Sequence, residues 1–161
     1  MDLSSVVAPE SASDLAEVLS DASRDGTSVR VAGGGSHSGY GAAEPADLVV
    51  STEGLGGIIS WEPDDLTVVV GAGARVDEVE HELRQRNQSM VLPEYPGPAT
   101  VGGCVAAGVS SLRRGRLYST RERVLEAVVV TGDGRIVRSG ARVVKNVTGY
   151  DLTRLHVGAF G

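Results

Sequence analysis

A run of three glycines directly after a short alternating strand constrains this chain more than any other sequence feature. Residues 28–32 alternate polar and apolar side chains, as a half-buried strand does, and lead straight into Gly33-Gly34-Gly35. Glycines leave their backbone N–H groups uncovered, and several converging N–H groups bind an anion such as a diphosphate. The run therefore predicts either a tight turn or an anion-binding loop.

The loop matches neither of the common nucleotide-binding glycine motifs. The P-loop requires a lysine that this stretch lacks, and the dinucleotide fingerprint requires a third glycine where Ser38 stands. Gly71-Ala72-Gly73 does not fit the fingerprint either. A second glycine-bearing stretch, Pro98-Ala99-Thr100-Val101-Gly102-Gly103, opens a segment of small residues that predicts a short, tightly packed helix. Two such loops could hold one diphosphate from both sides.

Charge and composition exclude several classes of function. Fifteen Lys and Arg residues against 21 Asp and Glu residues give a net charge of −6, which repels a phosphodiester backbone, so nucleic acid is not an expected partner. The single cysteine, Cys104, can form neither an internal disulfide nor a thiolate cage, and the three histidines share no ligand spacing, so no metal site is predicted. No apolar run approaches the roughly 20 residues of a membrane span, and no signal peptide is evident, so a cytoplasmic chain is expected.

Periodicity and turn residues predict a chain that mixes helices with strands. Helices are expected at 11–26, 76–86 and 100–108, with a final helical turn at 151–155. Strands are expected at 28–32, 47–51, 58–61, 66–70, 125–131 and 135–139. Gly132-Asp133-Gly134 predicts a hairpin turn, and the proline-rich stretch 92–98 is expected to link two subdomains, residues 1–92 and 93–161.

The order of these motifs resembles the FAD-binding domain of the vanillyl-alcohol oxidase and p-cresol methylhydroxylase (PCMH) type. The glycine loop, the 98–103 stretch, Arg113-Arg114, the hairpin turn, residues 144–155 and Gly158 to Gly161 follow one another as in that family. Residues 144–155, Val-Lys-Asn-Val-Thr-Gly-Tyr-Asp-Leu-Thr-Arg-Leu, look most like the FAD-binding subunit of glycolate oxidase. The resemblance implies an α+β fold of two α+β subdomains with FAD held between them. It also implies that residues 1–161 lack the last strand of that domain and the substrate domain that covers the flavin ring.

The same resemblance implies a set of cofactor-binding residues and leaves the catalytic residues unassigned. The first loop would bind the FAD pyrophosphate, and the second would approach the pyrophosphate and the flavin. The implied residues are Gly33, Gly34, Gly35, Ser36, His37, Ser38, Ala99, Thr100, Val101, Gly102, Gly103 and Gly108. Near the flavin, Ser111 and Ser119 stand where relatives commonly have glycine, so backbone strain is expected there if these positions need a positive φ.

His37 is open to two interpretations. Some relatives attach FAD covalently through a histidine beside this loop, and His37 lies four residues before Gly41, as in those relatives. The glycolate oxidase branch usually has another residue there, which favours a noncovalent position facing solvent or near the phosphates. Lys145, Asn146 and Asp151 are likewise open to a catalytic role or to a role in satisfying backbone groups.

Three functions are therefore considered. The first is an FAD-dependent oxidoreductase that takes a hydride from a 2-hydroxy acid such as glycolate, with the chemistry supplied by the cofactor. The second is a flavin-binding or electron-transfer subunit that needs partner subunits for turnover. The third is a truncated chain that keeps the fold and binds no cofactor.

Overall fold

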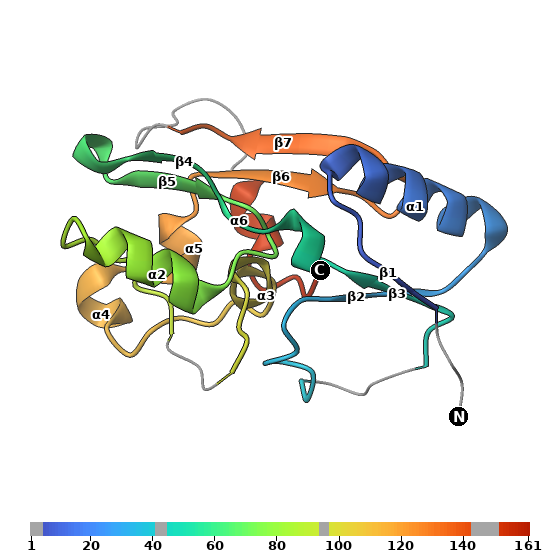
Figure 1. The fold of residues 1–161 in the computed structure, drawn as a ribbon, viewed down its shortest axis with the longest axis horizontal. Helices are drawn as coiled ribbons and strands as arrows, with labels where there is room; N and C mark the ends of the chain where they lie inside the picture. The colour runs from blue at the N-terminus through green and yellow to red at the C-terminus, as the bar shows by residue number, and fades with distance from the viewer. Residues whose placement is uncertain (1–4, 41–44, 94–96, 143–151) are drawn as a thin grey trace.

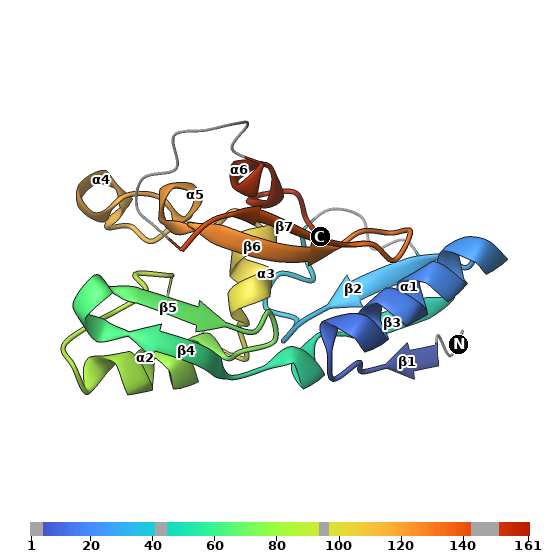
Figure 2. The same cartoon turned by 90° about the horizontal axis from the view of Figure 1, so that it is seen from above.

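The chain forms three small β-sheets with short helices around them (Figure 1). This computed structural model describes residues 5–40, 45–93, 97–142 and 152–161. Turned by 90°, the molecule shows the hairpin of β6 and β7 as a layer between α6 and the other two sheets (Figure 2). Among the described residues, no helix combines the length and the hydrophobicity needed to cross a membrane.

The first sheet carries the glycine loop at one end. Its strands are β1 (Ser5–Val7), β2 (Val29–Ala32) and β3 (Leu48–Ser51), all parallel, in the order β1-β3-β2. Helix α1 (Ala12–Asp25) connects β1 to β2, and it begins where the Ser11 side chain accepts a hydrogen bond from the Asp14 amide. Because parallel strands end at the same edge, the loop after β2 lies beside the residues that follow β1 and β3.

The second sheet is an antiparallel hairpin covered by one helix. Strands β4 (Ile58–Glu62) and β5 (Thr67–Val70) are joined by the short 3-10 helix η2 (Pro63–Asp65), and η1 (Glu53–Leu55) precedes them. Helix α2 (Val76–Arg84) follows β5. The apolar face of α2 packs against this hairpin, and the resulting core consists of Ala74, Val79 and Leu83 with Ile58, Trp61, Val68, Val70, Met90 and Val101 around it.

The remaining elements form the third part of the fold. They are α3 (Val101–Ala106), α4 (Arg114–Leu117), α5 (Thr120–Arg123), β6 (Glu126–Val130), β7 (Ile136–Gly140) and α6 (Thr153–His156). Thr100 caps α3 by accepting a hydrogen bond from the Gly103 amide. Arg121 binds the Arg154 carbonyl oxygen through Nε at 3.1 Å and Nη2 at 3.0 Å, and this fixes α6 against α5.

All the regular elements expected from the sequence are present within the described residues, and five short ones were not foreseen: β1, α4, α5 and the 3-10 helices η1 and η2. Strand β1 has only three residues and forms by pairing with β3, which lies more than 40 positions away in the chain. Helices α4 and α5 have four residues each, too short for a periodic pattern. Asp151, Lys145 and Asn146 lie outside the described residues, and the division at residue 92 stays a prediction.

Backbone strain is expected at Ser111 and Ser119 only if these positions need a positive φ, and that condition is not met. Neither residue has a positive φ: Ser119 lies at φ −77°, where it forms a capping box with Glu122 at the start of α5. The Ser119 amide and hydroxyl both donate to Glu122, which holds the pKa of that carboxyl below its usual range. The positive φ falls one residue earlier, on Tyr118 at 67°.

The hairpin turn between β6 and β7 should need glycine at one position only. Gly134 has a φ of 80°, and a Cβ there would lie 2.6 Å from the Ala16 carbonyl oxygen of α1, whereas nothing lies within 4 Å of a Cβ at Gly132. We expect Gly134→Ala to lower the free energy of unfolding by about 1–3 kcal/mol. Gly132→Ala should change it by less than about 0.5 kcal/mol. Urea unfolding measures both, and equal effects would contradict the packing of this turn on α1.

Candidate functional site

The two glycine-bearing loops predicted from the sequence lie in direct contact. A Cβ on Gly34 would overlap the backbone carbonyl oxygen of Pro98, and a Cβ on Gly33 would overlap the Thr100 hydroxyl. Gly33 and Gly34 are therefore required for the close approach of the two backbones, whether or not a ligand is bound. The structure thus brings Gly33 and Gly34 together with Pro98 and Thr100 of the second loop.

A third segment, residues 71–75, holds the second loop in place. The Val101 amide donates to the Ala74 carbonyl oxygen at 2.9 Å, and the Gly102 amide donates to the Ala72 carbonyl oxygen at 2.8 Å. A Cβ on Gly102 would lie only 2.8 Å from the Cβ of Ala72. Gly102 is therefore a close-packing glycine, and its amide is already engaged within the fold.

A fourth segment, residues 52–57, completes a ring of backbone contacts. Cβ atoms on Gly71 and Gly73 would overlap the carbonyl oxygens of Leu55 and Thr52, respectively. The Thr52 amide donates to the Ala32 carbonyl oxygen at 2.8 Å, which leads back to the start of the glycine loop. The sequence assigned no role to Gly71 and Gly73, and the structure shows that both allow a close approach of two backbone segments.

The glycine loop keeps a set of backbone donors that the fold does not use. Among the described residues, no acceptor pairs with the backbone N–H groups of Gly33, Gly34, Gly35 or Ser36. Gly35 has a φ of 76°, a left-handed conformation of the kind that lets successive N–H groups converge on one anion. Gly33, Gly34 and Ser36 are half-buried and Gly35 is exposed, so these donors lie at the surface, within reach of a ligand.

The loop closes on itself immediately after this set of donors. The Ser38 amide donates to the Gly35 carbonyl oxygen at 3.2 Å, and the Tyr40 amide donates to that of His37 at 3.0 Å. Ser36 Oγ lies 3.0 Å from His37 Nδ1, and the His37 ring meets the Tyr40 ring edge-on at 5.3 Å between centroids. Of the predicted residues, Ser38 thus has its amide engaged in the loop, while His37 is half-buried within it.

The predicted residues of the second loop are buried or have their amides hydrogen-bonded within the fold, so they contribute mainly by packing. Ala99 and Thr100 are almost completely buried, and the amides of Val101, Gly102 and Gly103 are bonded within the fold. Gly108 lies beyond the other end of α3, at a φ of 65°, where it packs against Gly158.

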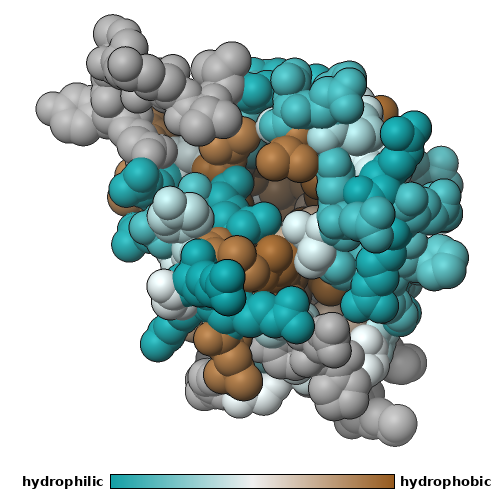
Figure 3. Space-filling model, turned by 90° about the vertical axis from the view of Figure 1, so that its left-hand side faces the viewer, coloured by the Kyte–Doolittle hydropathy of each residue, from teal (hydrophilic) through white to brown (hydrophobic). Residues whose placement is uncertain are grey.

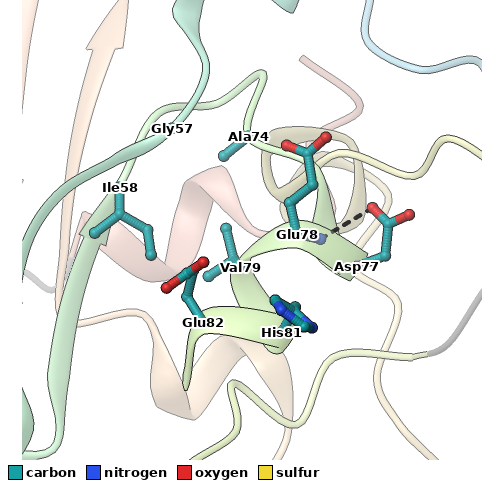
Figure 4. Close-up of a pocket in the computed structure, with 8 residues that line it drawn as sticks. All are labelled: Gly57, Ile58, Ala74, Asp77, Glu78, Val79, His81 and Glu82. Atoms are coloured by element: carbon teal, nitrogen blue, oxygen red, sulfur yellow. Dashed lines mark hydrogen bonds between the residues drawn. The ribbon is translucent and has the colours of Figure 1, made fainter. Parts of the chain in front are cut away.

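The described structure also has a hollow beside helix α2. It has a volume of about 520 Å³ and opens between α2 and the start of β4 (Figure 4). Its lining consists of Gly57, Ile58, Ala74, Asp77, Glu78, Val79, His81 and Glu82. Because its rim carries three carboxylates, the hollow repels a diphosphate, and the glycine loop is the better candidate for an anion site.

Cys104 lies in α3 beside the second loop and is fully buried. Burial raises the pKa of its thiol to about 11. A buried thiol that stays protonated at neutral pH is a packing group and a poor nucleophile. Cys104 therefore serves packing, in a core cluster with Val76 and Ala99.

A model of the family described as the FAD binding domain matches residues 3–140. The chain belongs to the FAD-binding domain family. It is 38% identical to glycolate oxidase subunit GlcE of Escherichia coli (strain K12) over 107 residues, which are 65% of this chain and 31% of that protein. It is 30% identical to a D-lactate dehydrogenase of Archaeoglobus fulgidus over 159 residues, covering 97% of this chain and 35% of that protein.

The fold agrees with that assignment. The crystal structure of 6-hydroxy-D-nicotine oxidase from Arthrobacter nicotinovorans superposes with a TM-score of 0.72 at 17% identity, over 84% of this chain and 29% of that one. The chain therefore shares its α+β fold with part of that oxidase. It spans about a third of the length of the curated relatives that it matches.

The contact between the two loops can be tested through stability. We expect Gly34→Ala to lower the free energy of unfolding by at least about 2 kcal/mol, because its methyl group would occupy the position of the Pro98 carbonyl oxygen. Gly39→Ala is the matched control, since a Cβ there meets nothing within 4 Å. If both variants unfolded at the same urea concentration, the loops would not be packed as described.

The environment of Cys104 predicts its reactivity. At pH 8 the thiol should resist iodoacetamide in the folded chain and react only after denaturation, because burial keeps it protonated and inaccessible. Mass spectrometry of native and urea-unfolded samples measures the modified fraction. Rapid alkylation of the native chain would show that α3 does not pack as the structure has it.

Proposed function

We propose that this chain binds FAD and holds its pyrophosphate on the backbone N–H groups of Gly33, Gly34, Gly35 and Ser36. The observation that carries the proposal is the set of surface donors without an acceptor among the described residues, in a chain of the FAD-binding domain family. Charge-assisted hydrogen bonds from backbone amides to an oxyanion are stronger than neutral ones, so four such donors favour a diphosphate.

The other residues implied by the resemblance have more limited roles in this proposal. Ala99, Thr100, Val101, Gly102 and Gly103 form a packed wall beside the glycine loop and keep it in place. Gly108 shapes the far end of α3. Ser38 and His37 close the loop beyond the donors, and both a noncovalent and a covalent role of His37 toward FAD stay open to experiment.

We further propose that the chain is the FAD-binding part of an oxidoreductase that acts on a 2-hydroxy acid. Two relatives bear the names of a glycolate oxidase subunit and a D-lactate dehydrogenase, and both names refer to 2-hydroxy acids. When bound, FAD would supply the redox chemistry by accepting a hydride. The residues of this chain position the cofactor, and the name of GlcE as a subunit favours the need for partner subunits.

A single pair of variants tests the anion site without disturbing the fold. Nothing lies within 4 Å of a Cβ at Gly35, and Asp and Asn both tolerate its positive φ. Gly35→Asp places a negative charge beside the diphosphate, whereas Gly35→Asn has nearly the same shape and no charge. Two like charges about 5 Å apart repel by roughly 3 kcal/mol at an effective dielectric constant of 20. We therefore expect Gly35→Asp to bind FAD at least about tenfold more weakly than Gly35→Asn.

Flavin fluorescence and absorbance after desalting measure this affinity. Equal affinities of the two variants would place the diphosphate away from the loop, and no retained flavin in the unmodified chain would contradict FAD binding by these residues alone. With flavin bound, anaerobic addition of glycolate or lactate distinguishes the two catalytic proposals. Bleaching by the chain alone supports an oxidoreductase complete in itself, whereas bleaching only after a partner is added supports a flavin-binding subunit.

A further inference from the structure

Residues 110–120 form an arm whose base is fixed by hydrogen bonds. The buried Thr120 hydroxyl donates to the Val109 carbonyl oxygen at 2.6 Å, and the Thr120 amide donates to Ser110 Oγ at 3.1 Å. Arg123 donates to the Leu117 carbonyl oxygen at 2.9 Å. The two ends of the arm are therefore tied together, and its tip, which includes α4, is held out from the body.

The tip of the arm is basic and apolar. Leu112 is fully exposed, and Tyr118 is 69% exposed. Arg113, Arg114 and Arg116 are also exposed, and no carboxylate pairs with them in the part of the chain that the structure describes. Figure 3 faces the end of the molecule that carries α4 and η2, and it shows apolar side chains at the surface between polar ones. A cationic cluster of this kind stands out in a chain whose net charge is −6.

The hollow beside α2 is apolar and acidic, and so it complements the apolar and basic tip of the arm. Its floor is apolar, formed by Ile58, Ala74 and Val79, and its rim is acidic (Figure 4). Asp77 on the rim is neutralised by Arg75, whose Nη2 lies 3.0 Å from Asp77 Oδ2. Glu78 and Glu82 have no cationic partner at ion-pair distance among the described residues. The hollow thus has an apolar floor between two carboxylates that form no ion pair among the described residues, although Glu78 is close enough to Arg75 to feel its charge.

We propose that the arm of one copy docks into the hollow of a second copy of this chain. Leu112 would occupy the apolar floor, and Arg113 and Arg114 would pair with Glu78 and Glu82. The arm does not occupy the hollow of the same copy, because α4 and α2 lie on opposite faces of the molecule in Figure 2. The volume of about 520 Å³ accommodates the leucine side chain and the arginine stems that flank it.

The occupant is a second copy because both halves of the contact are present in this one chain. The arm combines an apolar centre with positive charges, and the hollow combines an apolar floor with negative charges; these charges form no ion pair among the described residues. Pairs of exposed ions contribute little by themselves, so the contact is expected to be weak and sensitive to salt. This inference does not depend on FAD binding.

Sedimentation equilibrium of the 161-residue chain, at rising protein concentration, tests the proposal. At low salt we expect reversible self-association that weakens at least tenfold at about 1 M salt, where the Debye length falls to about 3 Å. The arm variant Arg113→Glu/Arg114→Glu and the hollow variant Glu78→Arg/Glu82→Arg should each be monomeric, because each brings like charges together. Mixed in equal amounts, the two variants should associate again, since each arm then meets a hollow of opposite charge.

Two further variants complete the design. Leu112→Asp should abolish association through loss of the apolar contact, while Glu17→Arg, an exposed charge reversal on α1, should leave it unchanged. A chain that is monomeric at every concentration and salt level would overturn the proposal. Failure of the two charge-reversed variants to associate on mixing would also overturn it. So would arm variants that lower flavin retention and leave association unaffected, because the arm would then belong to the cofactor-binding site.

Discussion

The structure depends on the close approach of four backbone segments through residues that have no side chain or a small one. Residues 33–34 lie on residues 98–100 of the second loop. Residues 99–102 of that loop are hydrogen-bonded to residues 72–76. Residues 71–73 in turn lie on residues 52–57, and Thr52 is hydrogen-bonded back to Ala32. At each contact a Cβ on the glycine would overlap or crowd a carbonyl oxygen or a neighbouring side chain. A tightly packed interior tolerates such changes poorly, so these glycines are fixed by packing before any ligand is considered.

This ring of contacts also accounts for the candidate site. The amides of Val101 and Gly102 donate hydrogen bonds that fix the second loop. The amides of Gly71 and Gly73 donate hydrogen bonds that fix the third segment. The glycine loop differs because the four backbone donors from Gly33 to Ser36 have no acceptor among the residues that the structure describes. A rigid surround with several unused amides is what an anion site requires, since the donors are positioned before the ligand arrives. Some glycines of this chain, such as Gly71 and Gly73, are therefore needed for close backbone packing, whereas Gly35 leaves its amide available to a ligand.

Much of the fold could be predicted from the sequence because its signals are local. Ser11 and Gly26 mark the two ends of α1, and the Gly132-Asp133-Gly134 turn marks the hairpin of β6 and β7. Strand β1 could not be predicted, because three residues carry no period and their pairing with β3 depends on distant contacts. The role of Gly71 and Gly73 was missed for the same reason: nothing local shows that they lie on Leu55 and Thr52. The two anion-binding candidates were found in sequence, but only the structure shows that the amides of one are already engaged.

The most direct test of this account is an amide NMR titration of the chain with FAD. The account predicts that the backbone N–H signals of Gly33, Gly34, Gly35 and Ser36 move most, because these donors have no acceptor among the described residues. The N–H signals of Val101 and Gly102 should move much less, since their hydrogen bonds to Ala74 and Ala72 persist. Shifts centred on the hollow beside α2, with the glycine loop unchanged, would contradict it.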